Sequence, residues 1–312
     1  MILTDLIGFA IASAIMVKAG AFAVKAITHI GKNLNIGHFM LSFLIVGMVN
    51  AMPESLVSAI SAFDGVPHLG FGVLIGSVIV DLTLVIGLVA ISAGSVRITR
   101  GFTYELWLFA LLSLLTALAL DGTLSRIEGA IMIGGCALFF YTLLKENHIV
   151  DKLVHSDRRH LPKQLLIFAA SAAVVFVSAN YVVKYSESVA ADIGMPLVLI
   201  GLVLIAITTS LPEAIFAITA ARKKLGDLAI GELFGVIMID GAFLTGLIAI
   251  IHPITIPPAE LAKLAIFYLT AVAIATYFVR SNRTLTWKDG IFMIMFYLLF
   301  IITELTTAGM QA

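Results

Sequence analysis

The sequence of 312 residues contains few charged residues and a single cysteine. Asp, Glu, Lys and Arg make up 12% of the chain, with 19 basic and 19 acidic residues and no formal net charge. This balance argues against a nucleic-acid partner, because nucleic-acid-binding domains carry an excess of Lys and Arg. The lone Cys136 excludes an intramolecular disulfide, and no Cys and His spacing resembles a zinc site. We therefore expect no resident cofactor.

Hydrophobic residues, in contrast, make up 61% of the chain, and the mean hydropathy is +1.10. A soluble domain of this length has too much water-facing surface for such a composition. The apolar runs are about 20 residues or longer, which is the length of a membrane-spanning helix and exceeds that of a barrel strand. Backbone groups in lipid must be satisfied within the segment, so these runs are expected to be helices. The first run carries Asp5 and lacks a basic n-region, which favours a retained helix over a signal peptide.

The apolar runs predict ten membrane spans. They are expected at residues 2–28, 38–64, 68–95, 103–121, 123–145, 163–187, 195–222, 226–251, 260–279 and 286–308. A polar linker at 148–162 divides them into a first repeat at 1–147 and a second repeat at 163–312. Because five is an odd number, the second set of five spans must enter the membrane from the opposite side. The sequence therefore predicts an all-α membrane protein of ten transmembrane helices, arranged as two inverted five-helix repeats with helices 2 and 7 broken.

The basic residues favour one orientation of these spans. With the N-terminus outside, 15 of the 19 Lys and Arg residues fall on the cytoplasmic side: Lys25, Lys32, Arg97, Arg100, Lys145, Lys152, Arg158, Arg159, Lys163, Arg222, Lys223, Lys224, Arg280, Arg283 and Lys288. Only Arg126, Lys184 and Lys263 fall outside, and Lys18 lies within the first span. Cytoplasmic loops of membrane proteins carry an excess of Lys and Arg. The sequence thus predicts a multi-pass protein of a prokaryotic cytoplasmic membrane with a cytoplasmic linker and both termini extracellular.

Two segments of the chain repeat the same pattern at an offset of 159 residues. The matched positions share a proline, three glycines and two acids: Pro53/Pro212, Glu54/Glu213, Gly72/Gly231, Gly76/Gly235, Asp81/Asp240 and Gly87/Gly246. Ionisable residues inside a membrane are costly and usually functional. We therefore interpret the four acids as a site at the centre of two related halves.

Each proline of this repeat falls about halfway along an apolar run. Proline removes a backbone donor and clashes with the preceding turn, so the helix must kink or break there. Pro53 and Pro212 suit the first turn of a second half-helix, where the helix N-terminus favours Glu54 and Glu213. The carbonyls freed before each proline then need partners. The alternative is that the prolines only kink the helices and the acids pair with lysines.

Carboxylates, carbonyls and hydroxyls form an oxygen-only ligand set, which suits a hard cation. Ca²⁺ takes about 6–8 oxygen ligands, and four acids with groups from both helix breaks could supply them. Ser77, Thr209 and Ser210 are neutral oxygen candidates, and no thiolate or imidazole cluster indicates a soft metal. Four carboxylates close together in a low-dielectric site cannot all stay ionised without a bound cation. Protons are therefore natural competitors of the divalent ion.

These segments resemble the alpha repeats of the calcium/cation antiporter superfamily, the sodium/calcium exchanger-like membrane proteins. The family pattern is Gly-Thr-Ser-Leu-Pro-Glu followed by Gly-Asn-x-x-Gly-Ser-Asn, and residues 208–213 read Thr-Thr-Ser-Leu-Pro-Glu. The resemblance covers essentially the whole chain, because ten helices in two inverted halves is the plan of the prokaryotic exchangers. It implies a secondary antiporter, not an enzyme, that moves Ca²⁺ across the membrane in exchange for Na⁺ by alternating access.

The resemblance also implies which residues bind the cations. The central ligands correspond to Glu54 and Glu213, and the following helices contribute Asp81 and Asp240. Further ligands are implied from backbone carbonyls and hydroxyls, namely the carbonyls of Asn50, Thr209, Gly47 and Ala206 and the hydroxyls of Ser77 and Ser210. The first and sixth spans are expected to act as gating helices that slide against this fixed site.

The chain departs from the family pattern at several of these positions. The Thr-Ser of the first repeat is Asn50-Ala51, and the serine expected after Gly235 is Val236. We therefore expect each flanking sodium site to lose one hydroxyl, Ala51 on one side and Val236 on the other. Asp81 occupies a position that is often Asn, which gives four acids. These departures leave the counter-ion open between sodium, protons and a monovalent cation such as potassium that shares the site.

Glu232 replaces the Asn of the family's second Gly-Asn step, eight residues before Asp240. It falls near the expected cytoplasmic end of its helix. We expect it to serve as a helix-terminal or interfacial charge. The alternative is a role at the entrance to the site.

Two other function classes stay open as alternatives. A cation channel needs weak successive sites rather than one closed acidic cage, and transport without a counter-ion would favour it. An intramembrane enzyme could use paired carboxylates for acid–base chemistry, although nothing resembles a Ser/His or His-Glu-x-x-His site. The expected partners are inorganic cations and the lipid bilayer, and the chain is expected to act as a monomer.

Overall fold

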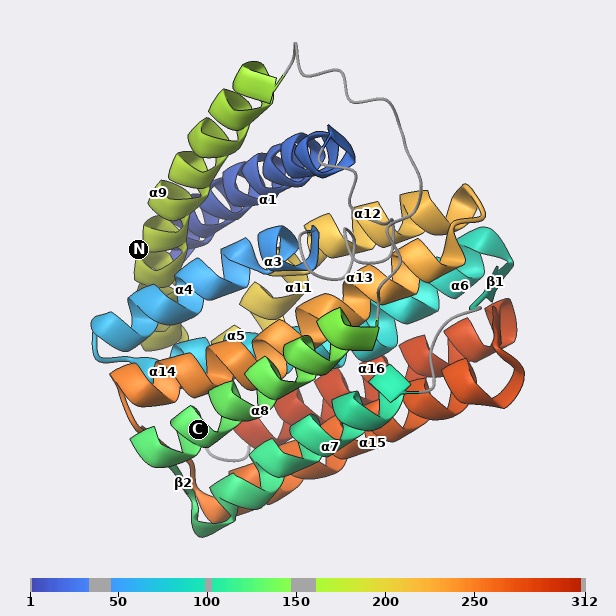
Figure 1. Cartoon of the computed structure of the whole chain (residues 1–312). Helices are drawn as coiled ribbons and strands as arrows, with labels where there is room; N and C mark the ends of the chain where they lie inside the picture. The colour runs from blue at the N-terminus through green and yellow to red at the C-terminus, as the bar shows by residue number, and fades with distance from the viewer. Residues whose placement is uncertain (1, 34–45, 99–102, 147–160, 310–312) are drawn as a thin grey trace.

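The protein is nearly all helical in its computed structural model, which describes residues 2–33, 46–98, 103–146 and 161–309 (Figure 1). Within these residues, eight helical segments are long and apolar enough to cross a membrane: Ile2–Ile30, Pro67–Ala93, Arg126–Leu143, Leu161–Ile193, Leu197–Arg222, Gly226–Ile251, Pro258–Phe278 and Trp287–Thr307. A shorter apolar helix covers Trp107–Asp121. The first part of the predicted second span, 38–45, lies outside the described residues. The chain is therefore a multi-pass helical membrane protein.

The elements follow each other in two similar series. The first series is α1 (Ile2–Asn33), α3 (Gly47–Asn50), α4 (Met52–Phe63), α5 (Pro67–Val80), a π-helical segment (Asp81–Val85), α6 (Ile86–Ala93), β1 (Ser95–Arg97), α7 (Thr103–Leu118), a 3₁₀ turn (Ala119–Asp121), β2 (Thr123–Leu124) and α8 (Arg126–Glu146). The second series is α9 (Leu161–Ile193), α10 (Leu197–Leu199), a π-helical segment (Ile200–Ile205), α11 (Ala206–Thr209), α12 (Leu211–Arg222), α13 (Gly226–Met238), a π-helical segment (Ile239–Leu244), α14 (Thr245–Ile251), β3 (Ile254–Thr255), α15 (Pro258–Asn282), β4 (Thr284–Thr286) and α16 (Trp287–Gly309).

The helices divide into central and peripheral ones. The apolar window of the span Pro67–Ala93 is 83% buried, whereas that of Trp287–Thr307 is 28% buried. Figure 1 shows α1 and α9 packed together on one side of the bundle, with α7, α8, α15 and α16 on the other side. A helix that is apolar on all sides and buried belongs in the middle of a bundle. The acids of the repeat lie on these central helices.

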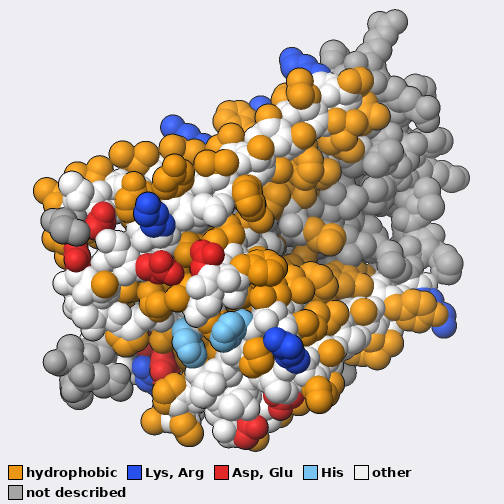
Figure 2. Space-filling model, turned by 90° about the vertical axis from the view of Figure 1, so that its left-hand side faces the viewer, with side chains coloured by type: hydrophobic (Ala, Val, Ile, Leu, Met, Phe, Trp, Pro, Cys, Tyr) orange, Lys and Arg blue, Asp and Glu red, His pale blue; other side chains and the backbone are white. Residues whose placement is uncertain are grey.

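The peripheral helices present large hydrophobic side chains outward. Leu3, Phe22, Leu166, Tyr277 and Met295 are all exposed. Figure 2 shows hydrophobic side chains spread over much of one face, with acidic and histidine side chains gathered between them. A soluble protein rarely exposes so much contiguous apolar surface, so this surface is suited to the hydrocarbon of a bilayer.

Each predicted helix break is present, and each is short. Ala51 lies between α3 and α4 and has φ −63° and ψ 2°. Ser210 lies between α11 and α12 and has φ −73° and ψ 0°. The proline that follows each break sits in the first turn of the next helix, because it needs no amide partner there. The carbonyls of Gly47 and Ala206 still accept the amides of Ala51 and Ser210, at 2.9 and 3.0 Å. A carbonyl oxygen has two lone pairs, so both carbonyls keep one for another ligand.

The helices after the breaks contain π-helical turns at matching places. Asp81 opens the segment Asp81–Val85, and Asp240 is the second residue of Ile239–Leu244. The hydroxyl of Thr245 donates to the carbonyl of Asp240 at 2.7 Å, five residues back. Such π-turns are uncommon and often occur at functional sites. Each half of the chain thus places an acid where its helix departs from regular geometry.

Contacts between the halves recur in corresponding form. Strand β1 pairs with β4, and β2 pairs with β3, both antiparallel. Helix α6 meets α16 through Gly87 and Gly290, and α14 meets α8 through Gly246 and Gly129. In both glycine pairs a Cβ would collide with the partner's carbonyl, so only glycine permits this approach. These glycines therefore allow α6 to pack closely against α16, and α14 against α8.

Candidate cation-binding site

The four acids of the repeat are all buried in the centre of the bundle. Glu54 and Glu213 lie in the first turns of α4 and α12, and Asp81 and Asp240 lie in π-helical segments. None of the four is more than 1% exposed. Helix α4 contacts the segment that carries Asp240, and α12 contacts the segment that carries Asp81. Each broken helix therefore faces the π-turn of the other half.

Electrostatic interactions join the four acids into one cluster. The charge of Glu54 acts on Asp81, Glu213 and Asp240. Asp81 acts in turn on Glu213 and Asp240. The sequence-predicted set of acids is thus brought within electrostatic reach of one another.

The carboxylate oxygens of this acid cluster lack partners. Both oxygens of Glu54, Asp81, Glu213 and Asp240 are buried without a hydrogen bond in the part of the chain that the structure describes. Among the same residues, no Lys or Arg forms an ion pair with any of them. A buried charge without a partner is strongly unfavourable, so these acids require a cation or protons. The alternative that the acids pair with lysines finds no support here.

The acids are not assembled into a tight cage. Among the described residues, no three His, Cys, Asp or Glu side chains converge closely enough to hold a metal ion as they stand. The ligand set is therefore spread between two halves of the molecule.

One flank of the acid cluster is lined by hydroxyls. The Ser77 and Thr209 hydroxyl oxygens lie 3.4 Å apart, and Thr209 also donates to the carbonyl of Ala206 at 3.2 Å. The Ser210 hydroxyl is buried without a partner among the described residues. Thr209 lies beside Glu54, and Ser210 lies beside Asp81. We call these three residues, Ser77, Thr209 and Ser210, the hydroxyl flank.

The opposite flank has a different composition. Asn50 is fully buried, and its side-chain amide donates a short hydrogen bond to Glu232. Gly47 packs against the backbone of Val236, and its carbonyl accepts the amide of Ala51. We call Asn50, Ala51, Glu232 and Val236 the acid flank. Ala51 and Val236, the two positions expected to lack a hydroxyl, are both included in this set, and their effect on the flanking sodium sites stays a prediction.

Glu232 is the residue whose position the sequence analysis misjudged. Rather than a helix-terminal or interfacial charge, it is a fully buried acid in contact with Asn50. A signal was present in the sequence, since Glu232, Val236 and Asp240 are spaced four residues apart and share one face of a helix. The helix face that lacks the expected hydroxyl, at Val236, therefore carries an additional carboxylate one turn away, at Glu232.

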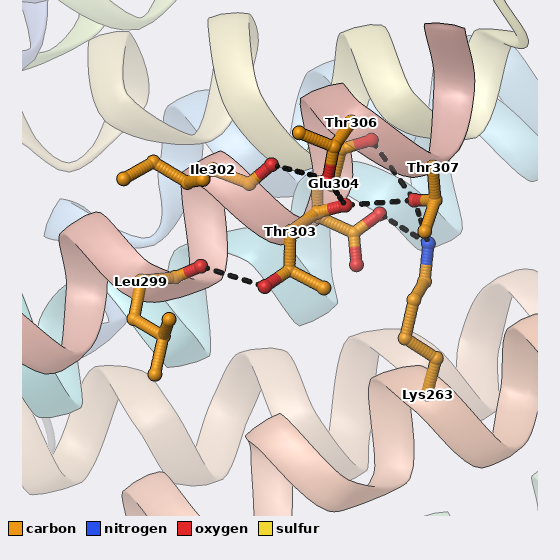
Figure 3. Close-up of polar contacts among 7 residues, drawn as sticks. All are labelled: Lys263, Leu299, Ile302, Thr303, Glu304, Thr306 and Thr307. Atoms are coloured by element: carbon orange, nitrogen blue, oxygen red, sulfur yellow. Dashed lines mark hydrogen bonds and ion pairs between the residues drawn. The ribbon is translucent and has the colours of Figure 1, made fainter. Parts of the chain in front are cut away.

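Another buried acid of the bundle, Glu304, has a cationic partner, as Figure 3 shows. Glu304 on α16 is only 2% exposed, but Lys263 on α15 donates to its carboxylate at 2.7 Å and to the Thr307 hydroxyl at 3.0 Å. Glu304 is therefore both buried and paired. Glu304 thus has the cationic partner that the four acids of the cluster lack among the described residues.

Comparisons with known proteins show the family of this chain. The sequence model of the family described as sodium/calcium exchanger protein matches residues 4–145 and 163–306. CaxA of Alkalimonas amylolytica is 32% identical over 254 residues, which cover 77% of this chain and 78% of CaxA. The sodium/calcium exchanger MaX1 of Methanosarcina acetivorans is 22% identical over 335 residues, covering 92% of this chain and 94% of MaX1.

Two solved structures have the same fold. The sodium-calcium exchanger NCX_Mj superimposes with a TM-score of 0.71 at 20% identity, covering 97% of this chain and 99% of that one. The H⁺/Ca²⁺ exchanger CAX superimposes with a TM-score of 0.79 at 16% identity, covering 97% of this chain and 87% of that one. These two proteins couple calcium to different ions, so the shared fold does not by itself select the counter-ion.

Proposed function

Because the chain belongs to the sodium/calcium exchanger protein family, we propose that it is a secondary antiporter that moves Ca²⁺ across the membrane in exchange for a second cation. The observation that carries this proposal is the acid cluster: four buried carboxylates, two from each half, whose oxygens have no partner among the described residues. Oxygen ligands with this much negative charge suit a hard divalent cation. Ca²⁺ is the substrate that both exchangers with this fold are named for.

Obligatory exchange follows from the cost of leaving the acid cluster without cations. Like charges in a low-dielectric interior repel strongly, so Ca²⁺ leaves readily only when other positive charge replaces it. A site of this kind binds one type of ion on one side of the membrane and its competitor on the other. This requirement distinguishes the proposed antiporter from a channel, which conducts through weak successive sites.

The proposed membrane arrangement is ten helices in two inverted repeats, 1–147 and 163–312, joined by a cytoplasmic linker, with both termini extracellular in the cell membrane. The corresponding glycine and strand contacts of the two halves support a repeat. Arg97, Arg222 and Lys224 line one cavity of about 380 Å³, so basic residues of both halves gather at one end. This end is the proposed cytoplasmic one. The chain is proposed to work as a monomer.

The proposed movement is a displacement of α1 and α9 against the acid cluster. These two helices pack extensively against each other and form one body beside the broken helices (Figure 1). A cavity of about 430 Å³ lies between α1, α12 and α13 and reaches Pro212, the residue before Glu213. Lys25 and Lys223 line the same cavity, which places its opening toward the basic end. Sliding of α1 and α9 would close this access and open the other side.

Sodium is the proposed counter-ion, and protons are the alternative. The hydroxyl flank supplies neutral oxygens of the kind that bind a sodium ion beside Glu54 and Asp81. Protons compete because the four acids cannot all remain charged without a cation.

The test is calcium-45 uptake into proteoliposomes at fixed membrane voltage. Outward gradients of sodium and of protons are applied separately, with a third set of vesicles lacking any counter-ion gradient. Antiport predicts uptake above the third set in at least one of the two arms, and the stimulating gradient identifies the counter-ion. Calcium entry that is equally fast in all three sets would contradict antiport and indicate a channel.

A further inference from the structure

Glu232 is a fifth buried acid at the centre of the bundle. It lies on α13, is fully buried, and has one oxygen, Oε1, bonded to the Asn50 side-chain amide. Its other oxygen, Oε2, is buried without a hydrogen-bond partner among the described residues. Its charge acts on Asp81 and Glu213, and the charge of Glu54 acts on it. Glu232 therefore adjoins the acid cluster without being one of its four repeat-related members.

Asn50 supplies an independent indication of a ligand. Its side chain is fully buried, and its oxygen, Oδ1, has no hydrogen-bond partner in the described part of the chain. Because Nδ2 of the same amide contacts Glu232, Oδ1 lies next to that contact. Two side chains that are bonded to each other thus each keep one buried oxygen without a partner. Buried polar atoms normally have partners, so this pair requires one.

The chemistry of these atoms selects the partner. Every available atom is an oxygen, which favours a hard cation over a soft one. No Lys or Arg forms an ion pair with Glu232 among the described residues. One carboxylate balances one positive charge, whereas the acid cluster has four carboxylates for a divalent ion. The carbonyl of Gly47, which keeps a lone pair and packs near Val236, is a further neutral oxygen on this flank.

We propose that Glu232 and Asn50 form a second cation-binding position, beside the acid cluster, that takes a monovalent alkali cation. This inference rests on the proposed antiport function and names the site through which its counter-ion acts. The carboxylate of Glu232 replaces the hydroxyls that Ala51 and Val236 do not provide. An alkali cation at this position neutralises Glu232 and weakens the field that the acid cluster exerts on Ca²⁺. Binding of the two ions is therefore antagonistic, as exchange requires.

The experiment uses the full chain in proteoliposomes with calcium-45. Uptake is measured against outward gradients of Na⁺ and, in separate vesicles, of K⁺, and as Ca²⁺/Ca²⁺ exchange without either ion. The wild type, Glu232→Gln, Glu232→Asp and the control Glu187→Gln are compared. Glu187→Gln removes a carboxylate on α9 away from the acid cluster. The Na⁺ and K⁺ arms identify the alkali cation.

For Glu232→Gln we expect the alkali concentration for half-maximal uptake to rise at least about tenfold, with a shallower concentration dependence. Glu232→Asp should recover part of the wild-type dependence, and Glu187→Gln all of it. If calcium uptake by the Glu232→Gln protein depended on the alkali-cation concentration as it does in the wild type, the inference would be overturned. A wild type that carries out Ca²⁺/Ca²⁺ exchange but responds to neither Na⁺ nor K⁺ would also overturn it.

A binding measurement separates this inference from the proposed function. Thermal stability of the purified protein is followed in detergent as Na⁺ or K⁺ is added, since a ligand that binds the folded state stabilises it. We expect stabilisation of the wild type and its loss in Glu232→Gln. If Ca²⁺/Ca²⁺ exchange is absent, antiport is wrong, and this binding difference alone decides the inference. Equal stabilisation of both proteins, or of neither, would overturn it.

Discussion

The hydroxyl flank and the acid flank occupy equivalent positions in the two halves but carry different chemistry. The 159-residue offset pairs Ser77 with Val236, Thr209 with Asn50, Ser210 with Ala51 and Val73 with Glu232. On the hydroxyl flank, the Ser77 and Thr209 hydroxyls lie 3.4 Å apart, and the position that matches Glu232 is the apolar Val73. On the acid flank, the Asn50 amide contacts the Glu232 carboxylate, and the positions that match Ser77 and Ser210 are the apolar Val236 and Ala51.

This difference shows that backbone symmetry and ligand chemistry are separable in this fold. The helix breaks, the π-turns and the four acids are retained in both halves. The neutral ligands around them are retained in only one. A flank that has lost hydroxyls and gained a carboxylate keeps oxygen ligands but changes its charge. The two flanks are therefore expected to bind cations with different strength and selectivity.

The largest effect is expected where the halves are alike. Glu54→Ala and Glu213→Ala should each lower calcium exchange in proteoliposomes by at least about a hundredfold, or about 2.8 kcal/mol, because each removes a central ligand charge. Both proteins should still insert and elute as folded species in detergent. If one variant lost calcium exchange and the other kept it in full, Glu54 and Glu213 would not contribute equally to the calcium site.

The paired acid Glu304 sharpens the contrast with the unpaired acid cluster. Lys263→Met should lower the free energy of unfolding in detergent by about 3–5 kcal/mol, because it leaves a buried carboxylate without its cation. The double variant Lys263→Met/Glu304→Leu should recover most of this loss. If the single and double variants are equally unstable in thermal melts, the ion pair is not the cause.

Glycines at the two flanks offer a matched test of packing. A Cβ at Gly76 would collide with the Leu202 carbonyl and the Ala206 side chain, whereas a Cβ at Gly47 meets the Val236 amide nitrogen at 3.3 Å. Gly76→Ala should therefore destabilise the protein by about 1–3 kcal/mol, and Gly47→Ala by less than about 1 kcal/mol. Thermal melts of the two variants check this order. The reverse order would mean that the acid flank is the more tightly packed one.

The smallest effect compares the equivalent positions Ser77 and Val236. Ser77→Ala removes a hydroxyl from the hydroxyl flank and should raise the sodium concentration for half-maximal exchange by about three- to tenfold. Val236→Ala removes only apolar atoms and should leave that concentration within about twofold. Equal shifts in both variants would mean that packing, rather than the hydroxyl, sets sodium affinity.

Much of the fold and the centre of the site could be predicted from sequence. Hydropathy gave the membrane helices, and proline chemistry gave the breaks at Ala51 and Ser210. The doubled Pro-Glu pattern gave the four acids, which the structure brings together. The exact count of ten spans and their inversion stay predictions. These features depend on local backbone chemistry and on a repeat, both of which a sequence displays directly.

The acid flank could not be predicted in the same way. Glu232 was expected to be a helix-end charge because the sequence shows the position of a residue along its helix. The sequence does not show which side chains of other helices pack against that residue. Its contact with Asn50 joins residues 182 positions apart and depends on how two helices pack. The pairing of Glu304 likewise depends on helix packing, because its partner Lys263 lies on another helix. The π-turns at Asp81 and Asp240 also had no sequence signal that we could identify.

The most direct test of the central claim is equilibrium binding of calcium-45 to the purified protein, with wild type and the variants Glu54→Gln, Asp81→Asn, Glu213→Gln and Asp240→Asn. The account predicts one Ca²⁺ per wild-type chain at saturation. It also predicts at least about tenfold weaker binding in each of the four variants, because every acid contributes charge to one cluster. Wild-type calcium affinity in the Glu54→Gln and Glu213→Gln proteins would contradict it.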